Sequence, residues 1–339
     1  MTAGKKQFTL QSEVNELYQF DCLREVAPYM FGHGKNIVFK RGYTFADIQK
    51  DHGTWDAKAA VDGVNRLLEI AESGQQFLFD LGTKEGRLLY YPAVLSKKRH
   101  GREDNKPYII LASGGGYFGV CTLVEAMPAA AYLNQKGFDV FCLNYRSGHI
   151  GLFPGVMEDM AAAVEFATSE CRDCGLSPKG YIVGGFSAGG HLAGMWGTQR
   201  GYAKYRLPKP QAVWLNYPMV SADIADQAGI FSAWIVRRLM FGLFGGKKKV
   251  RLWALDENIA EDYPDTFLVM AKDDDTIPQK LYEDLKKSLK LHHVNSRIRH
   301  VESGSHGYGL GVGTKAEGWL DEAVTFWEAC KQNGRRRTE

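Results

Sequence analysis

The sequence has few cysteines, no long apolar run and no marked excess of one charge. Six cysteines among 339 residues are too few for a disulfide framework and are typical of a reducing compartment. Lys and Arg number 42 against 39 Asp and Glu, for a net charge of +3, which is too balanced to predict a nucleic-acid partner. The basic runs Lys247–Lys249 and Arg335–Arg337 lack the interleaved aromatic side chains that stack on bases.

No segment is expected to cross a membrane or to direct secretion. The amino terminus contains no uninterrupted apolar stretch of about 7 to 15 residues after Lys5 and Lys6, so no secretory signal is predicted. The most apolar segment, 230–244, contains Arg237 and Arg238 and is shorter than the roughly 20 apolar residues that a membrane helix needs. We therefore expect a cytoplasmic protein without a membrane span.

The composition is that of an ordinary globular chain. Apolar residues make up 45% and charged residues 24%, which excludes a collagen-like, coiled-coil or intrinsically disordered protein. The C-x-x-C motif at Cys171 and Cys174 has neither a second cysteine pair nor a histidine at zinc spacing. We therefore predict no zinc or redox site.

Short apolar runs alternate with helical segments over most of the chain. Residues 77–81 and 88–95 predict an opening antiparallel pair of strands. The later apolar runs are continuous rather than alternating, which is typical of a mostly parallel sheet with helices on both faces. The buried strands are expected at 108–113, 140–145, 181–186, 212–217 and 267–271, and the helices between them at 120–136, 155–170, 189–199 and 278–291.

Two regions interrupt this alternation. Residues 1–76 are polar with helical periodicity, and 55–74 place an apolar stripe on one helix face. They predict an N-terminal helical arm that packs on the main domain or forms a lid. Residues 221–260 predict a lid-like insertion over the carboxyl edge of the sheet, within one α/β domain spanning 77–333.

A G-x-S-x-G motif follows the strand predicted at 181–186. Gly185, Ser187 and Gly189 stand at the end of this strand, immediately before a helical segment. A nucleophile elbow needs small residues two positions on either side of the serine, because the strained turn brings neighbouring backbones close together. A glycine-rich helix start that serves only close packing is the alternative, and the position after a buried strand favours a catalytic serine.

A second glycine cluster, SGGGYFG at 113–119, follows the strand predicted at 108–113. The N–H group of Gly115 or Gly116, together with that of Ala188, could stabilise the oxyanion that forms when an ester or amide carbonyl is attacked. A phosphate-binding loop is the alternative. It is disfavoured because the cluster matches neither G-x-x-x-x-G-K-[ST] nor G-x-G-x-x-G.

A serine hydroxyl needs a base, and in this architecture the chain order is serine, acid, histidine. His306 lies in a glycine-rich loop after the strand-like segment 297–302 and is the predicted base. His191 is close to the serine in sequence, but its position on the following helix directs it away from the hydroxyl.

The acid is expected among three consecutive aspartates, Asp273, Asp274 and Asp275, which follow the strand at 267–271. Only one of them can reach the histidine. Another could cap the helix that begins near Pro278, since short acidic side chains accept hydrogen bonds from the N–H groups at a helix start.

These motifs together resemble the α/β-hydrolase carbohydrate esterases of the acetyl-xylan esterase and BD-FAE (feruloyl esterase-like) type. The resemblance covers roughly residues 105–330 and rests on SGGGYFG, LNYR, the helix with Glu158 and Asp159, GFSAGGHLAG, the acidic turn and GSHGYGLG, in that order. The hormone-sensitive-lipase branch is disfavoured because it carries HGGG where this chain has Ser113 before the three glycines. The family's D-x-x-[VI]-P turn implies Asp274 as the acid, with Asp273 as the second choice.

The resemblance implies a serine carboxylester hydrolase without a cofactor, acting commonly on acetyl groups of plant-polysaccharide sugars. The expected partner is a small-molecule or oligosaccharide ester, and Tyr117 of the glycine cluster is predicted to contact it. Trp214, Trp234 and Trp253 could stack on sugar rings or belong to the core. Residues 1–85 and the insertion fall outside the family pattern and are expected to shape the substrate pockets.

Three other functions remain open from the sequence alone. A serine exopeptidase or a small-amide hydrolase of the kynurenine-formamidase kind would use the same three residue types on the same fold. A non-catalytic binding module is disfavoured, because candidates for all three catalytic roles are present. A homo-oligomer is also compatible with the sequence.

Overall fold

The computed structural model describes residues 7–31, 39–94, 107–173, 180–223, 234–243 and 246–336. Within these residues, eight strands form one sheet in the order β1-β2-β4-β3-β5-β6-β7-β8. The strands are β1 (Leu78–Asp80), β2 (Arg87–Tyr91), β3 (Tyr108–Ala112), β4 (Val140–Asn144), β5 (Tyr181–Phe186), β6 (Ala212–Asn216), β7 (Asp265–Ala271) and β8 (Ser296–Val301).

The strands from β3 to β8 run parallel, whereas β1 and β2 form the antiparallel opening pair that the sequence predicts. Strands β3 to β7 are buried almost throughout, and their side chains alternate between two apolar clusters. In β3, for example, Ile110 belongs to one cluster and Ile109 to the other. The mostly parallel, doubly covered sheet expected from the continuous apolar runs is therefore confirmed.

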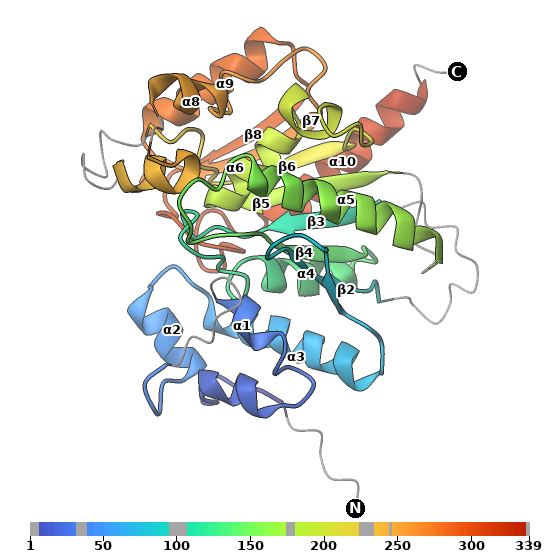
Figure 1. Ribbon diagram of the computed structural model, residues 1–339, viewed down its shortest axis with the longest axis vertical. Coiled ribbons are helices and arrows are strands. Elements are labelled where there is room, and N and C mark those ends of the chain that lie inside the picture. Colours follow the sequence, from blue (N-terminus) through green and yellow to red (C-terminus); the bar gives the residue numbers. More distant parts are fainter. Residues whose placement is uncertain are drawn as a thin grey trace, which may run out of the picture.

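Helices cover both faces of the sheet (Figure 1). One face packs against α5 (Gly155–Asp173), α6 (Ser187–Trp196) and α9 (Gln279–Leu291). The other face packs against α4 (Ala126–Gln135) and α10 (Trp319–Arg336). A short helical turn, η2 (Gln199–Ala203), follows α6.

The N-terminal segment forms η1 (Val14–Gln19), α1 (Ala27–Met30), α2 (Phe45–Asp51) and α3 (Ala57–Glu72), which lie together at one end of the molecule (Figure 1). The apolar face of α3 packs on α4. A Cβ atom at Gly63 of α3 would lie 3.0 Å from the carbonyl carbon of Met127, so glycine permits this close approach of the two backbones. The buried residues of these helices belong to the same apolar cluster as α4 and α10.

Part of the insertion predicted at 221–260 lies outside the described residues. The described part contains a helix over 234–241 and α8 (Lys247–Leu252). The amide groups of Leu152 and Phe153 donate hydrogen bonds to the carbonyls of Leu239 and Met240, at 2.8 and 2.9 Å. The first of these two helices therefore covers the loop that follows β4.

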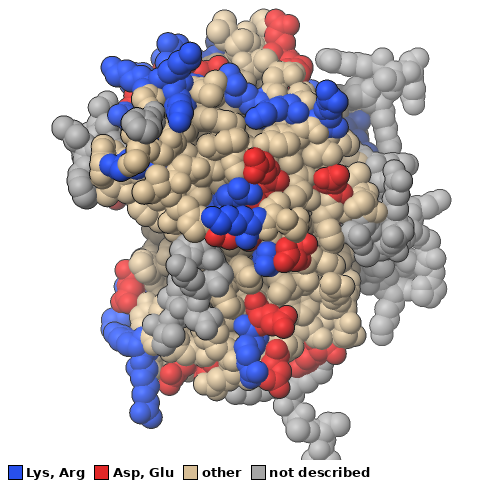
Figure 2. Space-filling model, in the orientation of Figure 1, with Lys and Arg blue, Asp and Glu red and all other residues tan. Residues whose placement is uncertain are grey.

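The basic run 247–249, expected in a loop, instead forms the exposed first turn of α8. Figure 2 shows Lys and Arg side chains gathered at the end of the molecule where α8 and α9 lie, with Asp and Glu side chains nearby. Among the described helices, none combines the length and the apolar character that a bilayer crossing needs.

Candidate active site

The predicted site residues all follow strands that end at one edge of the sheet. The glycine cluster follows β3, Ser187 follows β5, the three aspartates follow β7, and His306 follows β8. Because β3, β5, β6, β7 and β8 are parallel and adjacent in the sheet, their carboxyl ends bring these segments together.

The turn at Ser187 has the geometry of a nucleophile elbow. Ser187 is the first residue of α6 and has a φ of +49°, a conformation that is strained for a residue with a side chain. A Cβ atom at Gly185 would lie 2.3 Å from the carbonyl oxygen of Gly189, and one at Gly189 would lie 2.1 Å from that of Ala112. The motif therefore needs glycine at both positions, because no side chain fits there.

His306 lies between Ser187 and Asp274. Its Nε2 atom is 2.9 Å from Ser187 Oγ, and its Nδ1 atom is 2.9 Å from Asp274 Oδ2. The carboxylate of Asp274 is buried, with an exposed fraction of 4% for the residue, and it also accepts a hydrogen bond from the Tyr282 hydroxyl at 2.7 Å. The structure thus brings together a hydroxyl, an imidazole and a buried carboxylate in the order that nucleophilic catalysis requires.

The other oxygen of Asp274 accepts hydrogen bonds from the amides of Thr276 and Ile277, at 2.9 and 2.8 Å. With four donors around it, counting Tyr282 and His306, this carboxylate is fully hydrogen-bonded despite its burial. Its position relative to His306 is therefore fixed from several sides.

Asp273 holds the histidine loop rather than a helix end. Its Oδ1 atom accepts hydrogen bonds from the amides of Gly304 and Ser305, at 2.9 and 2.8 Å. The N-cap of α9 is Pro278, and it makes no side-chain capping hydrogen bond. The expectation that an aspartate caps this helix is wrong. Asp274 accepts hydrogen bonds from amides of the turn before the helix, and Asp273 accepts them from amides of the loop before His306.

The glycine cluster borders the same cavity as Ser187. Gly115 and Gly116 have φ values of +123° and +61°, which glycine adopts without strain. A Cβ atom at Gly115 would lie 2.4 Å from the carbonyl oxygen of Gly119. Ala188 stands in the first turn of α6, where N–H groups have no partner within the helix. Of the predicted oxyanion donors, Gly115 and Gly116 thus line the same cavity as Ser187, and Ala188 directly follows the serine in α6.

Glu125 is a buried carboxyl group that the sequence did not reveal. Its Oε2 atom accepts a hydrogen bond from the Gly114 amide at 2.5 Å, and its Oε1 atom accepts one from the Tyr217 hydroxyl at 2.9 Å. The same hydroxyl accepts a hydrogen bond from the Gly309 amide at 3.0 Å. Glu125 therefore links the glycine cluster to the loop that carries His306, and burial raises its pKa to about 7.

Tyr117 does not contact the cavity, so its predicted role in substrate binding is wrong. A φ of +64° turns its side chain into the core, where it is fully buried and its hydroxyl lies 2.7 Å from His191 Nδ1. Nε2 of His191 lies 2.7 Å from the Trp253 carbonyl, which can only accept, so Nε2 carries the proton and Nδ1 accepts from Tyr117. Burial also lowers the pKa of His191 to about 4, which keeps the ring neutral.

The three tryptophans considered for sugar stacking do not line the cavity. Trp214 and Trp253 are buried in the core. Trp234 is 49% exposed and packs against Arg238, whose guanidinium lies 4.5 Å from its ring centre. A different tryptophan, Trp55, lines the cavity instead.

The cavity around the serine has a volume of about 510 Å³. One of its walls comes from the α2–α3 loop, which belongs to residues 1–85, the region predicted from the sequence to shape the substrate pockets. Among the described residues that line it, none is Lys or Arg. The lining residues are Asp51, His52, Gly53, Thr54, Trp55, Gly115, Gly116, Cys121, Glu125, Ser187, Asp275, Thr276, Ser305, His306 and Gly307.

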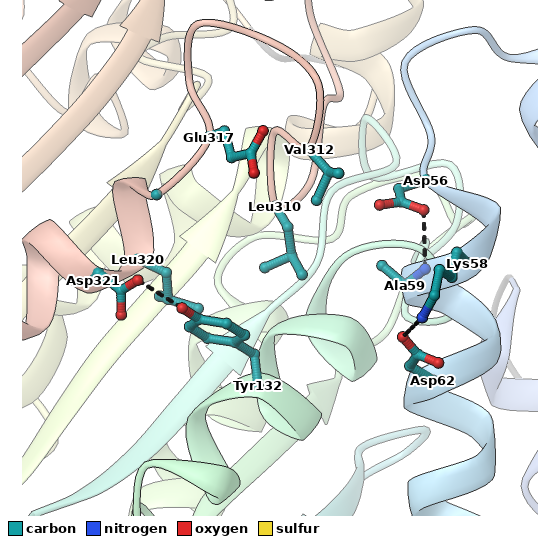
Figure 3. A pocket seen from close by; sticks show the side chains of 11 residues that line it. Asp56, Lys58, Ala59, Asp62, Tyr132, Leu310, Val312, Glu317, Leu320 and Asp321 are labelled. Atoms are coloured by element: carbon teal, nitrogen blue, oxygen red, sulfur yellow. Dashed lines mark hydrogen bonds and ion pairs between the residues drawn. The ribbon is translucent and has the colours of Figure 1, made fainter.

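A second cavity, of about 380 Å³, lies between α3, α4 and segment 310–321 (Figure 3). Its carboxylates already have partners: Asp62 lies 2.7 Å from Lys58 Nζ, and the Tyr132 hydroxyl donates to Asp321 at 2.6 Å. No Ser, Cys or His is found among the described residues around it. It therefore offers no pairing of a serine or cysteine nucleophile with a histidine base.

In the described part of the chain, no group of three or more His, Cys, Asp and Glu side chains could hold a metal ion. Cys174 of the C-x-x-C motif lies outside the described residues, as does the side chain of Cys171.

Comparison with known proteins finds a family that matches part of the chain. Residues 96–229 match the family model BD-FAE. The sequence resemblance to carbohydrate esterases of this type is thus confirmed, and the matched residues include the glycine cluster and Ser187.

Solved structures similar to this chain are α/β-hydrolases. An acetyl ester-xyloside bifunctional hydrolase from Caldicellulosiruptor lactoaceticus is 25% identical, with a TM-score of 0.61 over 75% of this chain and 91% of that one. A carboxylesterase from Lactobacillus plantarum is 18% identical, with a TM-score of 0.60 over 78% of this chain and 97% of that one. This chain therefore has the α/β-hydrolase fold.

Two curated relatives match over shorter regions. An acetylxylan esterase from Xylanibacter ruminicola is 30% identical over 115 residues, which cover 34% of this chain and 23% of that protein. Endo-1,4-beta-xylanase B from Butyrivibrio fibrisolvens is 22% identical over 189 residues, which cover 53% and 29%. The matched part of this chain thus spans less than a third of the length of either relative.

Proposed function

We propose that the protein is a serine carboxylester hydrolase that removes acetyl or other small acyl groups from carbohydrate esters. The observation that carries the proposal is the continuous hydrogen-bonded series from Ser187 Oγ through His306 to Asp274, with 2.9 Å at each step. This series ends in a hydroxyl that borders a 510 Å³ cavity.

In the first half of the reaction, Ser187 Oγ attacks the ester carbonyl while His306 Nε2 accepts the hydroxyl proton. Asp274 holds Nδ1–H, which fixes the tautomer and stabilises the imidazolium. The negative charge on the carbonyl oxygen is met by the N–H groups of Ala188 and of Gly115 or Gly116. The C–O bond to the alcohol then breaks, and the alcohol leaves with the proton held by His306.

In the second half, a water molecule gives its proton to the same imidazole and attacks the acyl-enzyme. The bond from the acyl carbon to Ser187 Oγ breaks, the serine recovers its proton from His306, and the carboxylic acid leaves. No cofactor takes part in either half of this scheme.

The cavity supports a neutral, polar substrate. Its wall is built largely from backbone and short polar side chains, and no cationic side chain is present among its described lining residues to bind a carboxylate or phosphate. A relative named as an acetylxylan esterase and a structural neighbour named as an acetyl ester-xyloside bifunctional hydrolase support the same class of substrate.

Replacement of the nucleophile tests the proposal. We expect Ser187→Ala to abolish p-nitrophenyl acetate turnover and labelling by a fluorophosphonate, because both need Oγ. Ser169→Ala is the matched control, since this serine is exposed on α5 and should behave as wild type. Wild-type turnover by Ser187→Ala would refute the assignment.

The alternative of a serine exopeptidase or amide hydrolase is separated by substrate choice. Faster cleavage of an aminoacyl p-nitroanilide than of p-nitrophenyl acetate would favour the exopeptidase, and preference for formyl anilides would favour the small-amide hydrolase. We expect the acetyl ester to be the better substrate.

A further inference from the structure

We propose that residues 51–55, the last residue of α2 and the α2–α3 loop that follows it, form a saccharide-binding wall that holds the neutral sugar whose acyl group is removed. The inference deepens the proposed function and rests on it. The loop belongs to the N-terminal segment and lies outside the residues 96–229 that match the family.

The loop lies directly beside the reacting groups. Its five residues border the same cavity as Ser187 and His306. A Cβ atom at Gly307, next to the imidazole, would lie 3.5 Å from Trp55 Nε1 and 3.8 Å from Thr54 Oγ1. A sugar whose ester carbonyl is attacked by Ser187 Oγ would therefore lie against this loop.

The loop is held in place before any substrate arrives. The Trp55 amide donates to the His52 carbonyl at 3.0 Å, and the two rings stack with their centres 4.2 Å apart and an interplanar angle of 32°. The Tyr43 hydroxyl donates to Asp51 Oδ2 at 2.9 Å, which fixes the carboxylate at the rim of the cavity. Binding then orders few side chains, which lowers its entropic cost.

The chemistry of the loop matches a sugar. The imidazole of His52 is exposed and backed by Trp55, so it offers a flat face and ring nitrogens to a pyranose. The Asp51 carboxylate and the Thr54 hydroxyl oxygen line the same cavity and can accept hydrogen bonds from sugar hydroxyl groups. The cavity has three acidic lining residues, Asp51, Glu125 and Asp275, and no described cationic one, which disfavours anionic sugars.

Two substrates separate recognition of the sugar from the chemical step. For each variant, kcat/KM would be measured with partially acetylated xylotriose and with p-nitrophenyl acetate, which has no sugar. We expect His52→Ala to lower kcat/KM for the acetylated xylotriose about tenfold relative to kcat/KM for p-nitrophenyl acetate. A tenfold loss corresponds to one hydrogen bond or ring contact. His293→Asn is the matched control, because this exposed histidine lies beyond the end of α9 and outside the cavity.

A charge-changing variant gives a second readout. Asp51→Asn keeps an oxygen that can accept from Tyr43 while removing the negative charge at the rim. We expect the preference for a neutral acetylated xylo-oligosaccharide over one that bears a glucuronic acid to fall several-fold, and to fall less at high salt, where the charges are screened. A purely structural role for the loop would leave this preference unchanged.

The proposal is overturned if His52→Ala lowers both kcat/KM values equally, or if Asp51→Asn leaves the preference for neutral sugars unchanged. The proposed function fails separately, through retention of p-nitrophenyl acetate turnover in Ser187→Ala. Failure of the saccharide wall would thus leave an esterase whose sugar lies elsewhere.

Discussion

The reaction centre and the α2–α3 loop border one cavity, but they are built in different ways. The reaction centre depends on backbone geometry. Ser187 and two residues of the glycine cluster, Gly115 and Gly116, have positive φ, and the surroundings of Gly185 and Gly189 leave no room for a side chain. The loop instead presents side chains such as His52 and Trp55 to the cavity, at positions where the backbone does not require glycine. Backbone constraints leave a pattern in the sequence, whereas a recognition surface on a loop leaves none.

The largest expected effect separates the catalytic aspartate from its neighbour. Asp274→Asn should lower kcat for p-nitrophenyl acetate by about 10⁴-fold, because the amide favours the wrong histidine tautomer. Asp275→Asn, which changes a residue at the cavity rim, serves as the control and should change kcat only a few-fold. Equal losses in both variants would show that the acid has been misassigned.

The next prediction concerns the N-terminal helices as part of the fold. Leu67→Ala on α3 removes a fully buried side chain from the cluster shared with α4, and should lower the free energy of unfolding by about 2–5 kcal/mol. Because that cluster is continuous with the sheet, urea denaturation should show one transition at a lower midpoint. A separate early transition of the N-terminal segment would mean that the two regions unfold independently.

A change in the glycine cluster tests the backbone requirement. Gly115→Ala should lower kcat by on the order of 10²-fold, because the added Cβ would meet the Gly119 carbonyl oxygen and displace the oxyanion donors. Gly246→Ala is the control, since nothing lies within 4 Å of a Cβ there and its φ is negative. Steady-state kinetics with p-nitrophenyl acetate measure both, and an active Gly115→Ala enzyme would contradict the assignment.

The smallest effect concerns the pH dependence that Glu125 contributes. Its pKa is raised to about 7 in the folded protein, with burial as the main cause, so between about pH 4.5 and 7 the folded state keeps a proton that the unfolded state loses. Stability conferred by this proton is complete below that window and falls by up to about 3 kcal/mol as pH rises through it. Glu125→Gln cannot ionise, so its stability relative to wild type should improve from pH 5 to pH 8.

Urea unfolding at both pH values measures this change. Glu165→Gln changes an exposed position on α5, so its free energy of unfolding should change with pH as that of the wild type does. If the free energy of unfolding of Glu125→Gln also changes with pH as that of the wild type does, Glu125 is already ionised at pH 5 in the folded protein.

The sequence was sufficient for the fold and for the positions of Ser187 and His306, because strand periodicity and the glycine spacing are local signals. It was insufficient for Glu125, whose partner Tyr217 is 92 positions away. It placed residues 1–85 near the substrate pockets but did not identify the α2–α3 loop, whose position beside His306 depends on tertiary packing such as that of α3 on α4. Tyr117 was misplaced because a motif gives its position but not the backbone conformation that turns its side chain inward.

The attachment of the α2–α3 loop to a helix outside the matched family region also has a consequence for divergence. A relative could exchange this short connection, or replace the whole helical segment that presents it, without disturbing any bond within the reaction centre. Under the proposed function, substrate choice and the chemical step can therefore change separately. A fragment limited to residues 96–229 would lack the proposed saccharide-binding wall, as well as Asp274 and His306.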